Sequence, residues 1–189
     1  MYLGFPLTLR SSPPSLWLDV LAKLKVKIIY WGGLWLSMVG KLILVKVVLS
    51  TFPIFQSALL LAPKSILAQI SKIMRDFLWL GGKGNHNKMH LVSWEVLKRP
   101  FSEGGLQIRD PRMTNLALSG KLIWQLFEDK HHLVSHIFRM KYLRGAPLRS
   151  ISSANTPPGT TIWNSCRKSF GFFTQQLFRI PGNGKSTLL

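Results

Sequence analysis

The chain has 189 residues, enough for one domain or two small ones, and 47% of them are hydrophobic. Seven tryptophans and 11 phenylalanines allow a sizeable core, which excludes a wholly disordered chain. Lys and Arg number 25 against seven Asp and Glu, a formal charge of +18. This excess indicates a polyanionic partner, either nucleic acid or an anionic membrane surface. A single cysteine, Cys166, excludes an internal disulfide framework and a paired-cysteine metal site, and we expect an intracellular protein.

The positive charge is spread along the chain rather than gathered in a tail. Net charges of +5, +4, +5 and +4 fall on residues 1–62, 63–110, 111–150 and 151–189, and no acidic residue follows Asp129. Charge distributed over helical segments suits a surface that follows a phosphate backbone better than a flexible arm. The alternative is that these charges only solvate an unusually basic surface.

Hydrophobic periodicity predicts helices from residue 17 onward, after an extended and then turn-rich start over residues 1–16. The first predicted helix ends at Gly32-Gly33. Its apolar stripe consists of Trp17, Leu21, Leu24, Ile28 and Trp31. A second helix, from about Ser37 to Thr51, is apolar nearly all round, so we expect it at the centre of the fold, and Pro53 stops it.

The third predicted helix begins near Ser65 and closes at Gly81-Gly82, before a polar, basic loop over Gly81–His90. Its apolar stripe consists of Ile66, Ile70, Ile73 and Phe77. Ser93 is expected to cap a short helix that runs through Lys98 and that Pro100 terminates.

The sequence after this short helix predicts a turn, an extended piece and a long helix. Glu103-Gly104-Gly105 forms the turn, and Leu106–Arg109 the extended piece. Asp110-Pro111 is typical of an N-cap followed by proline at the first helical position, and the helix it opens runs to about Asp129. Its apolar residues fall on two faces, which predicts packing between other elements: Leu116, Gly120, Ile123 and Phe127 on one, Leu118 and Leu122 on the other.

Two further helices are predicted, over Leu133–Tyr142, ending at Arg144-Gly145, and over Trp163–Phe178. Between them, Ala146–Thr161 is rich in Ser, Pro and Gly and is the predicted linker. We therefore expect a mainly α fold, a helical bundle with two or three short strands and an extended C-terminal segment. The predicted organisation is one region over residues 1–145, a linker over 146–161 and the start of a further region over 162–189.

The run Leu42–Ala62 is long enough to cross a membrane. Lys46 lies inside it and Pro53 divides it, both unfavourable for a span, and no signal-peptide pattern precedes it. We expect a buried pair of elements there, with membrane anchoring as the less favoured alternative.

No motif for nucleotide or metal chemistry is complete. The phosphate-loop-like GNGKST at Gly182–Thr187 has Arg179 where the pattern needs glycine. His132 and His136 have helical spacing but lack the glutamate of a zinc-protease motif, so we expect no metal. The seven carboxylates are scattered, and the one adjacent pair, Glu128-Asp129, ends a helix, so no set for two-metal catalysis is evident.

Several motifs in order resemble a known family. They are YLGFPL (Tyr2–Leu7), WGGLWLSMVGKLILVKVVLSTFPIF (Trp31–Phe55), APKSILAQISKIMRDFLWLGG (Ala62–Gly82), HLVSWEVLKRPFSEGGLQIRDPRMTNLALSGKLIWQLFED (His90–Asp129), MKYLRG (Met140–Gly145) and IPGNGKS (Ile180–Ser186). Together they resemble the region just after the polymerase core in plant LINE-type (non-LTR) retrotransposon reverse transcriptases, which are RNA-directed DNA polymerases. The most specific part is the His90–Asp129 motif.

The resemblance implies a helical thumb and connecting region, which in such polymerases packs beside the template–primer duplex. The catalytic palm of that family precedes the YLG-type motif and its Cys/His region follows the GNGKS-type motif. We therefore expect a truncated transposable-element product, in the nucleus or cytoplasm, with no catalytic residues, no metal, no cofactor and no small-molecule substrate. Alternatives are a basic membrane-surface protein anchored through Leu42–Ala62 and a poorly folded relic.

The expected partner is an RNA or DNA backbone, bound without sequence preference through phosphate contacts. The candidate contact residues are Lys23, Lys27, Lys72, Arg75, Lys83 and Lys88. The alternative for these residues is that they only solubilise apolar helices.

Overall fold

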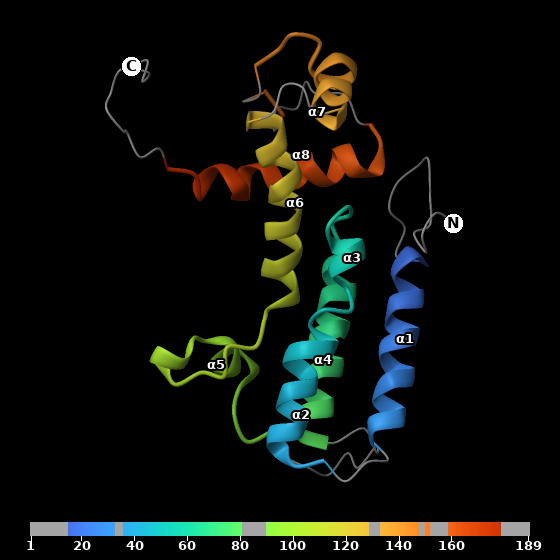
Figure 1. Cartoon of the computed structure of the whole chain (residues 1–189), viewed down its shortest axis with the longest axis vertical. Coiled ribbons are helices and arrows are strands. Elements are labelled where there is room, and N and C mark those ends of the chain that lie inside the picture. Colours follow the sequence, from blue (N-terminus) through green and yellow to red (C-terminus); the bar gives the residue numbers. More distant parts are fainter. Residues whose placement is uncertain are drawn as a thin grey trace.

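The computed structural model describes residues 15–32, 36–80, 90–128, 133–147, 150–151 and 159–178. These residues are mainly helical (Figure 1). The α-helices are α1 (Ser15–Gly32), α2 (Met38–Leu44), α3 (Ile54–Ser57), α4 (Lys64–Leu80), α5 (Trp94–Lys98), α6 (Pro111–Glu128), α7 (Leu133–Phe138) and α8 (Thr161–Gln175). The π-helical segment η1 (Val45–Leu49) continues α2, the 3₁₀ segment η2 (Phe101–Glu103) follows α5, and the π-helical segment η3 (Arg139–Leu143) continues α7.

Local capping explains where several helices begin. Ser37 accepts a hydrogen bond from the Gly40 amide at 3.2 Å, and Ser93 caps α5 by accepting from the Val96 amide at 3.4 Å. Asp110 accepts from the Arg112 amide at 2.8 Å, with Pro111 as the first residue of α6. These caps satisfy amides that have no partner inside the helix. The predicted starts at Ser93 and at Asp110-Pro111 are therefore confirmed.

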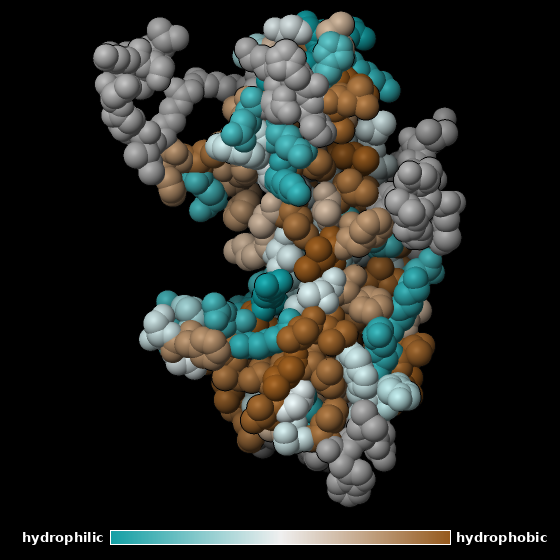
Figure 2. All heavy atoms as spheres, viewed as in Figure 1, coloured by the Kyte–Doolittle hydropathy of each residue, from teal (hydrophilic) through white to brown (hydrophobic). Residues whose placement is uncertain are grey.

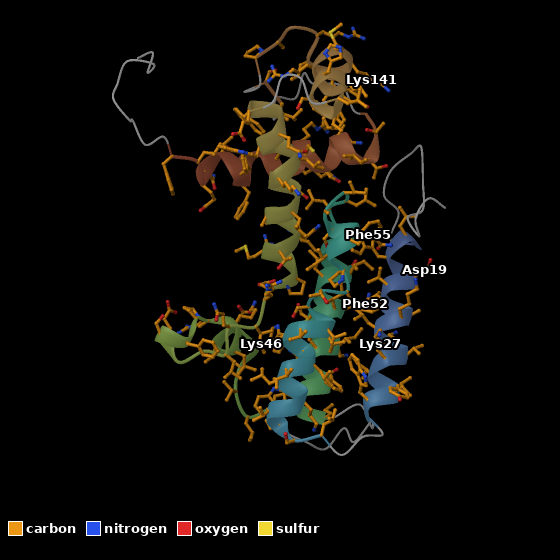
Figure 3. The ribbon with its side chains drawn as sticks, viewed as in Figure 1. Asp19, Lys27, Lys46, Phe52, Phe55 and Lys141 are labelled. Carbon is orange, nitrogen blue, oxygen red and sulfur yellow. The ribbon has the colours of Figure 1, made fainter. Side chains whose placement is uncertain are left out.

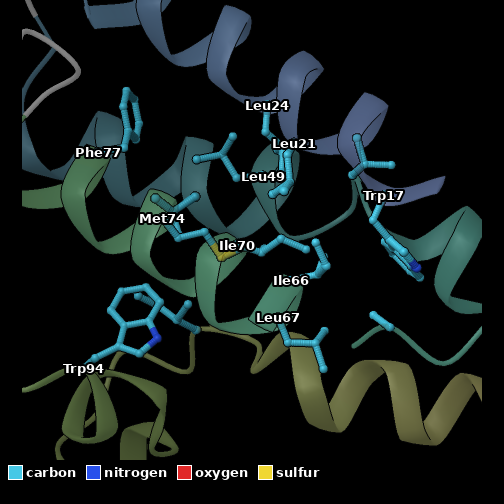
Figure 4. Close-up of a cluster of buried hydrophobic side chains, with 14 of the residues drawn as sticks. Trp17, Leu21, Leu24, Leu49, Ile66, Leu67, Ile70, Met74, Phe77 and Trp94 are labelled. Atoms are coloured by element: carbon cyan, nitrogen blue, oxygen red, sulfur yellow. The ribbon is translucent and has the colours of Figure 1, made fainter. Parts of the chain in front are cut away.

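One hydrophobic cluster joins α1, α4, η1 and the α5 segment (Figure 4). Trp17, Leu21 and Leu24 of α1 are buried, while Ile28 and Trp31 are half-buried at its edge, so the predicted stripe is confirmed. From α4 the same cluster takes six buried residues, namely Ile66, Leu67, Ile70, Met74, Phe77 and Leu78.

The helix predicted to lie at the centre of the fold lies at its edge instead. Val45 and Leu49 of η1 are buried against α4, but Val39, Ile43 and Val47 are 65%, 54% and 61% exposed. These three residues recur every four positions and therefore share one helical face. Figure 2 shows hydrophobic residues over α2 and η1 on the lower part of the visible face. An all-round apolar helix needs neighbours on every side, and in the described structure this one has them on one side only.

No strand occurs among the described residues, so the two or three predicted strands are not found there. The extended piece Leu106–Arg109 does form, but it pairs with the end of α5. The amides of Leu106 and Ile108 donate to the Leu97 carbonyl oxygen at 3.0 and 3.3 Å. Because the partner is a helix end, no regular ladder can develop.

The segment from α5 to Asp110 forms an arm beside the bundle (Figure 1). Gly104 has φ = 75°, and a Cβ on Gly105 would lie 2.1 Å from the backbone carbonyl oxygen of Arg99. Glycine is therefore required at 105, and the predicted turn is confirmed.

Helix α6 links the two hydrophobic clusters of the described structure. It packs on α3 and α4 and also on α7 and α8, as its two apolar faces predict. Around its C-terminal half, a second cluster gathers nine buried residues: Ile123, Leu126, Phe138, Tyr142, Leu143, Ile151, Trp163, Cys166 and Phe170. Ile151 belongs to the segment predicted as a linker, so that part of it is packed.

A buried amide fixes the segment between α3 and α4 to α6. Asn115 is fully buried; its Oδ1 accepts from the Ala62 amide at 2.8 Å, and its Nδ2 donates to the carbonyl oxygens of Ser57 and Leu60 at 3.0 and 2.8 Å. From α8, Ser165 Oγ accepts from the Leu61 amide at 2.9 Å. The end of the Leu42–Ala62 run, from the end of α3 to Ala62, is thus held by side chains distant in sequence.

The Leu42–Ala62 run is interrupted in the structure as predicted. It passes through the end of α2, η1, a turn at Pro53, α3 and a second turn. Among the residues described, no helix is both long and apolar enough to cross a membrane.

Several predicted features lie outside the described residues. They are residues 1–14 of the extended start, the closing Gly81-Gly82, residues 81–89 of the basic loop, His132 and the GNGKST segment.

Candidate nucleic-acid interface

Cations outnumber carboxylates three to one in the described residues, with 18 Lys and Arg against six Asp and Glu. Asp76 faces Arg75 and His90 at 3.8 and 3.7 Å. Both contacts involve the same carboxylate, whose negative charge is thereby partly offset for an approaching anion. The remaining surplus of cations is spread over the helices and favours polyanions.

Lys23 and Lys27 lie one turn apart on one flank of α1, and both are exposed. The Nζ of Lys27 lies 5.7 Å from the Trp31 ring centroid and 5.5 Å from that of Phe52 (Figure 3). An ammonium group over aromatic faces is held there by the ring quadrupole. Lys27 therefore has a packing role that the sequence did not indicate, whereas no ring or ion pair holds Lys23 within the described structure.

Lys72 is exposed on the side of α4 opposite its buried face, by helical geometry, whereas Arg75 lies on the flank of α4, half-buried and with its Nε buried. Helix α1 packs on that buried face, where the rings of Trp31 and Phe77 are 6.0 Å apart. The structure therefore does not bring Lys72 and Arg75 together with Lys23 and Lys27. A nucleic acid that contacts both pairs has to pass around the bundle. Lys83 and Lys88 lie outside the described residues.

Lys98, which is not among the six candidate contact residues, forms ion pairs with two carboxylates. Lys98 Nζ lies 2.7 Å from Glu95 and 2.8 Å from Asp110, and its side chain is only 16% exposed. Burial alone would lower the pKa of Lys98, but the hydrogen bonds to Asp110 and Glu95 outweigh it and raise the pKa. The contact between Lys98 and Asp110 joins α5 to the N-cap of α6, so it ties the start of the arm to its end.

No group of three or more His, Cys, Asp or Glu able to hold a metal ion occurs in the part of the chain that the structure describes. His136 is exposed on α7. Cys166 is buried in the second hydrophobic cluster, and burial raises the pKa of its thiol to about 12. The thiol is therefore protonated and packed.

The MKYLRG motif forms a basic corner that sequence reasoning did not select. Tyr142 stacks on Trp163 with ring centroids 4.5 Å apart and planes 10° from parallel. Lys141 and Arg144 on either side of it are exposed, and Figure 3 places Lys141 in the region of α7, far from the Lys27 site. The sequence signal for the corner was Gly145, because a glycine commonly follows the end of a helix.

Comparison with known proteins gives two relatives, while no family model and no solved structure matches. Over 172 residues, 88% of the chain, the sequence is 32% identical to a provisionally named ribonuclease H protein of Arabidopsis thaliana. Over 136 residues, 71% of the chain, it is 25% identical to an uncharacterized mitochondrial protein of the same plant and covers 86% of it. The chain spans 27% of the length of the first relative, so its similarity concerns about a quarter of that protein.

Proposed function

We propose that the chain binds nucleic acid without sequence preference, through phosphate contacts made by exposed lysines and arginines. The observation that carries this proposal is the threefold excess of cations over carboxylates on the described helices. Phosphate contacts supply affinity and position but no base information, so the expected binding is non-specific.

The relatives support a nucleic-acid setting. Proteins of this kind are typical of retrotransposon-derived sequences, and one of them is named for ribonuclease H. Together with the ordered motifs, they support descent from the segment that follows the polymerase core of a plant LINE-type reverse transcriptase. In that proposal the described bundle is the thumb and connecting region.

The proposed role is binding rather than chemistry. We expect no primer extension by the purified chain on RNA or DNA templates with Mg²⁺ or Mn²⁺, because no converging set of carboxylates is evident in the sequence. Template-dependent incorporation that survives repurification and follows the protein through a sizing column would contradict this expectation.

The binding proposal is tested by fluorescence anisotropy with labelled 20-mers of three unrelated sequences, each as a single strand and as a duplex. We expect affinities that agree among sequences within about threefold. A preference of a hundredfold or more for one sequence would refute phosphate-only recognition, because non-specific contacts carry no base information.

Lys23→Gln and Lys27→Gln separate binding from packing on α1. Lys23→Gln should weaken nucleic-acid binding and leave the free energy of unfolding unchanged. Lys27→Gln should also lower stability, by about 0.5–1 kcal/mol, since it removes the ammonium group from the Trp31 and Phe52 rings. Equal affinity of wild type and Lys23→Gln would remove Lys23 from the interface.

A further inference from the structure

The corner that follows α7 has an unusual backbone. The π-helical segment η3 ends at Arg144, which has φ = 47°, and Gly145 follows with φ = 86°. The Arg144 amide donates to the Arg139 carbonyl oxygen at 2.8 Å, which closes the last turn. Glycine adopts this left-handed conformation freely, whereas arginine does so at a cost. Residues held in such conformations, and π-helical turns, are concentrated at functional sites.

Tyr142 fixes this corner to the start of α8. Its hydroxyl accepts from the Thr160 amide at 3.0 Å and donates to Thr160 Oγ1 at 3.3 Å. Gly159 packs so closely on the Tyr142 ring that a Cβ there would lie 2.3 Å from a ring carbon. Both polar atoms of the Asn164 amide group bond the Gly159 backbone, at 2.9 and 3.3 Å. With the stack on Trp163, these contacts make the corner a rigid support.

Two of the exposed side chains on this support are cationic, and no carboxylate lies within ion-pair distance of them in the described structure. Lys141 and Arg144 are both exposed, and Lys141 Nζ lies 5.5 Å from the Tyr142 ring centroid. Described residues 133–178 contain no Asp or Glu at all. An anion that approaches the corner therefore meets no carboxylate from these elements, although the carbonyl groups at the C-terminal end of η3 carry partial negative charge.

We propose that Lys141 and Arg144 form a preorganised contact for a backbone phosphate of nucleic acid. The inference rests on the proposed function and adds to it a specific site, absent from the six candidates that the sequence indicated. In this proposal, phosphate binding by the guanidinium accounts for an arginine at a position where glycine would have no conformational cost. Arginine suits this task, since its planar group can donate two parallel hydrogen bonds to phosphate oxygens.

Arg144→Gly separates a binding role of Arg144 from a structural one. It removes the guanidinium charge, and it places at this position the residue that adopts the left-handed conformation without cost. We expect its midpoint of urea unfolding to rise and its nucleic-acid affinity to fall about eightfold at 0.1 M salt, which corresponds to one lost phosphate contact. The slope of log K against log salt should become shallower by about 0.9 for duplex DNA. Arg144→Lys should retain the slope, and Lys64→Gln, an exposed lysine at the start of α4, is the matched control for general charge.

Arg144→Asn is the second variant, because asparagine also tolerates the left-handed conformation and carries no charge. An affinity and slope equal to wild type in both Arg144→Gly and Arg144→Asn would overturn the site and leave the general binding proposal standing. Failure of the wild type to bind any nucleic acid would overturn both proposals.

Lipid headgroups also present phosphates, and Ile137 and Met140 are exposed near the corner. Vesicles of phosphatidylcholine with 20% phosphatidylserine form the second arm of the experiment. We expect no sedimentation with vesicles at salt concentrations where duplex DNA is bound. Vesicle binding that Arg144→Gly abolishes, with DNA binding unchanged, would assign the corner to membranes and overturn the proposal.

Discussion

Replacing Asn115 by alanine should be among the most destabilising single changes in the described structure. The side chain makes three hydrogen bonds, to the Ala62 amide and to the carbonyl oxygens of Ser57 and Leu60. Alanine cannot form any of these bonds, so all three backbone groups lose their partner at once. Because Asn115 is fully buried and the three residues it bonds are buried too, water cannot readily replace the amide.

The size of the effect follows from these groups. A buried backbone group that loses its partner costs about 1–3 kcal/mol, so three such groups set a range of about 3–9 kcal/mol. Relaxation of the 57–62 segment lowers the cost, and we expect a loss of about 3–5 kcal/mol in the free energy of unfolding. Small proteins are stable by only about 5–15 kcal/mol, so the variant should be close to unfolding at 37 °C.

Urea unfolding followed by tryptophan fluorescence measures this loss. The matched control is Ser119→Ala, one turn later on α6. Ser119 is equally buried, but its hydroxyl has no hydrogen-bond partner in the described structure, so its removal should cost nearly nothing. A loss below about 1 kcal/mol for Asn115→Ala, or equal losses in the two variants, would refute the role assigned to Asn115.

Three further predictions concern the arm and the second cluster. Lys98→Met should lower the free energy of unfolding by about 2 kcal/mol near neutral pH, because it removes the contacts with Glu95 and Asp110. Since the pKa of Lys98 is raised in the folded protein, this difference from wild type should persist below about pH 10 and shrink as the pH rises through that pKa. Equal stability of the two proteins near neutral pH would contradict the pairing. Cys166 should react with a thiol reagent at pH 8 at least a hundredfold more slowly in the native protein than in urea, since burial raises its pKa to about 12, and equal rates would contradict its burial. Gly105→Ala should increase amide exchange in the arm, because its Cβ would collide with a backbone carbonyl oxygen 2.1 Å away; unchanged exchange would contradict that geometry.

Features set by neighbouring residues were predictable from the sequence. The stripe on α1, the cap at Ser93 and the Asp110-Pro111 start of α6 depend on spacing and on side chains that bond the nearest amides. These signals act within one or two turns, and the structure reproduces them.

Features that depend on long-range contacts were not predictable. Asn115 shows in the sequence only as a polar residue in an apolar helix, and its partners lie more than 50 positions away. The exposure of Val39, Ile43 and Val47 depends on which elements cover α2 and η1, and an all-round apolar pattern does not specify that.

For the candidate contact residues, too, local features were predictable from the sequence and long-range ones were not. Exposure of Lys23 and Lys72 follows from their places off the apolar stripes, as predicted. Helical spacing gives no distance between helices, so it could not show that the two pairs project from different sides. Nor could it show that Lys27 lies over the ring of Phe52, 25 positions further along the chain.

The most direct test of the central claim is the salt dependence of nucleic-acid binding by the wild-type chain. Anisotropy titrations of one duplex at five salt concentrations between 50 and 300 mM give the slope of log K against log salt. Simultaneous contact of about five or six cations with phosphates of a duplex predicts a slope of about −4.5 to −5.4. A slope near zero would contradict binding through phosphate contacts and leave the charge of +18 without the role proposed for it.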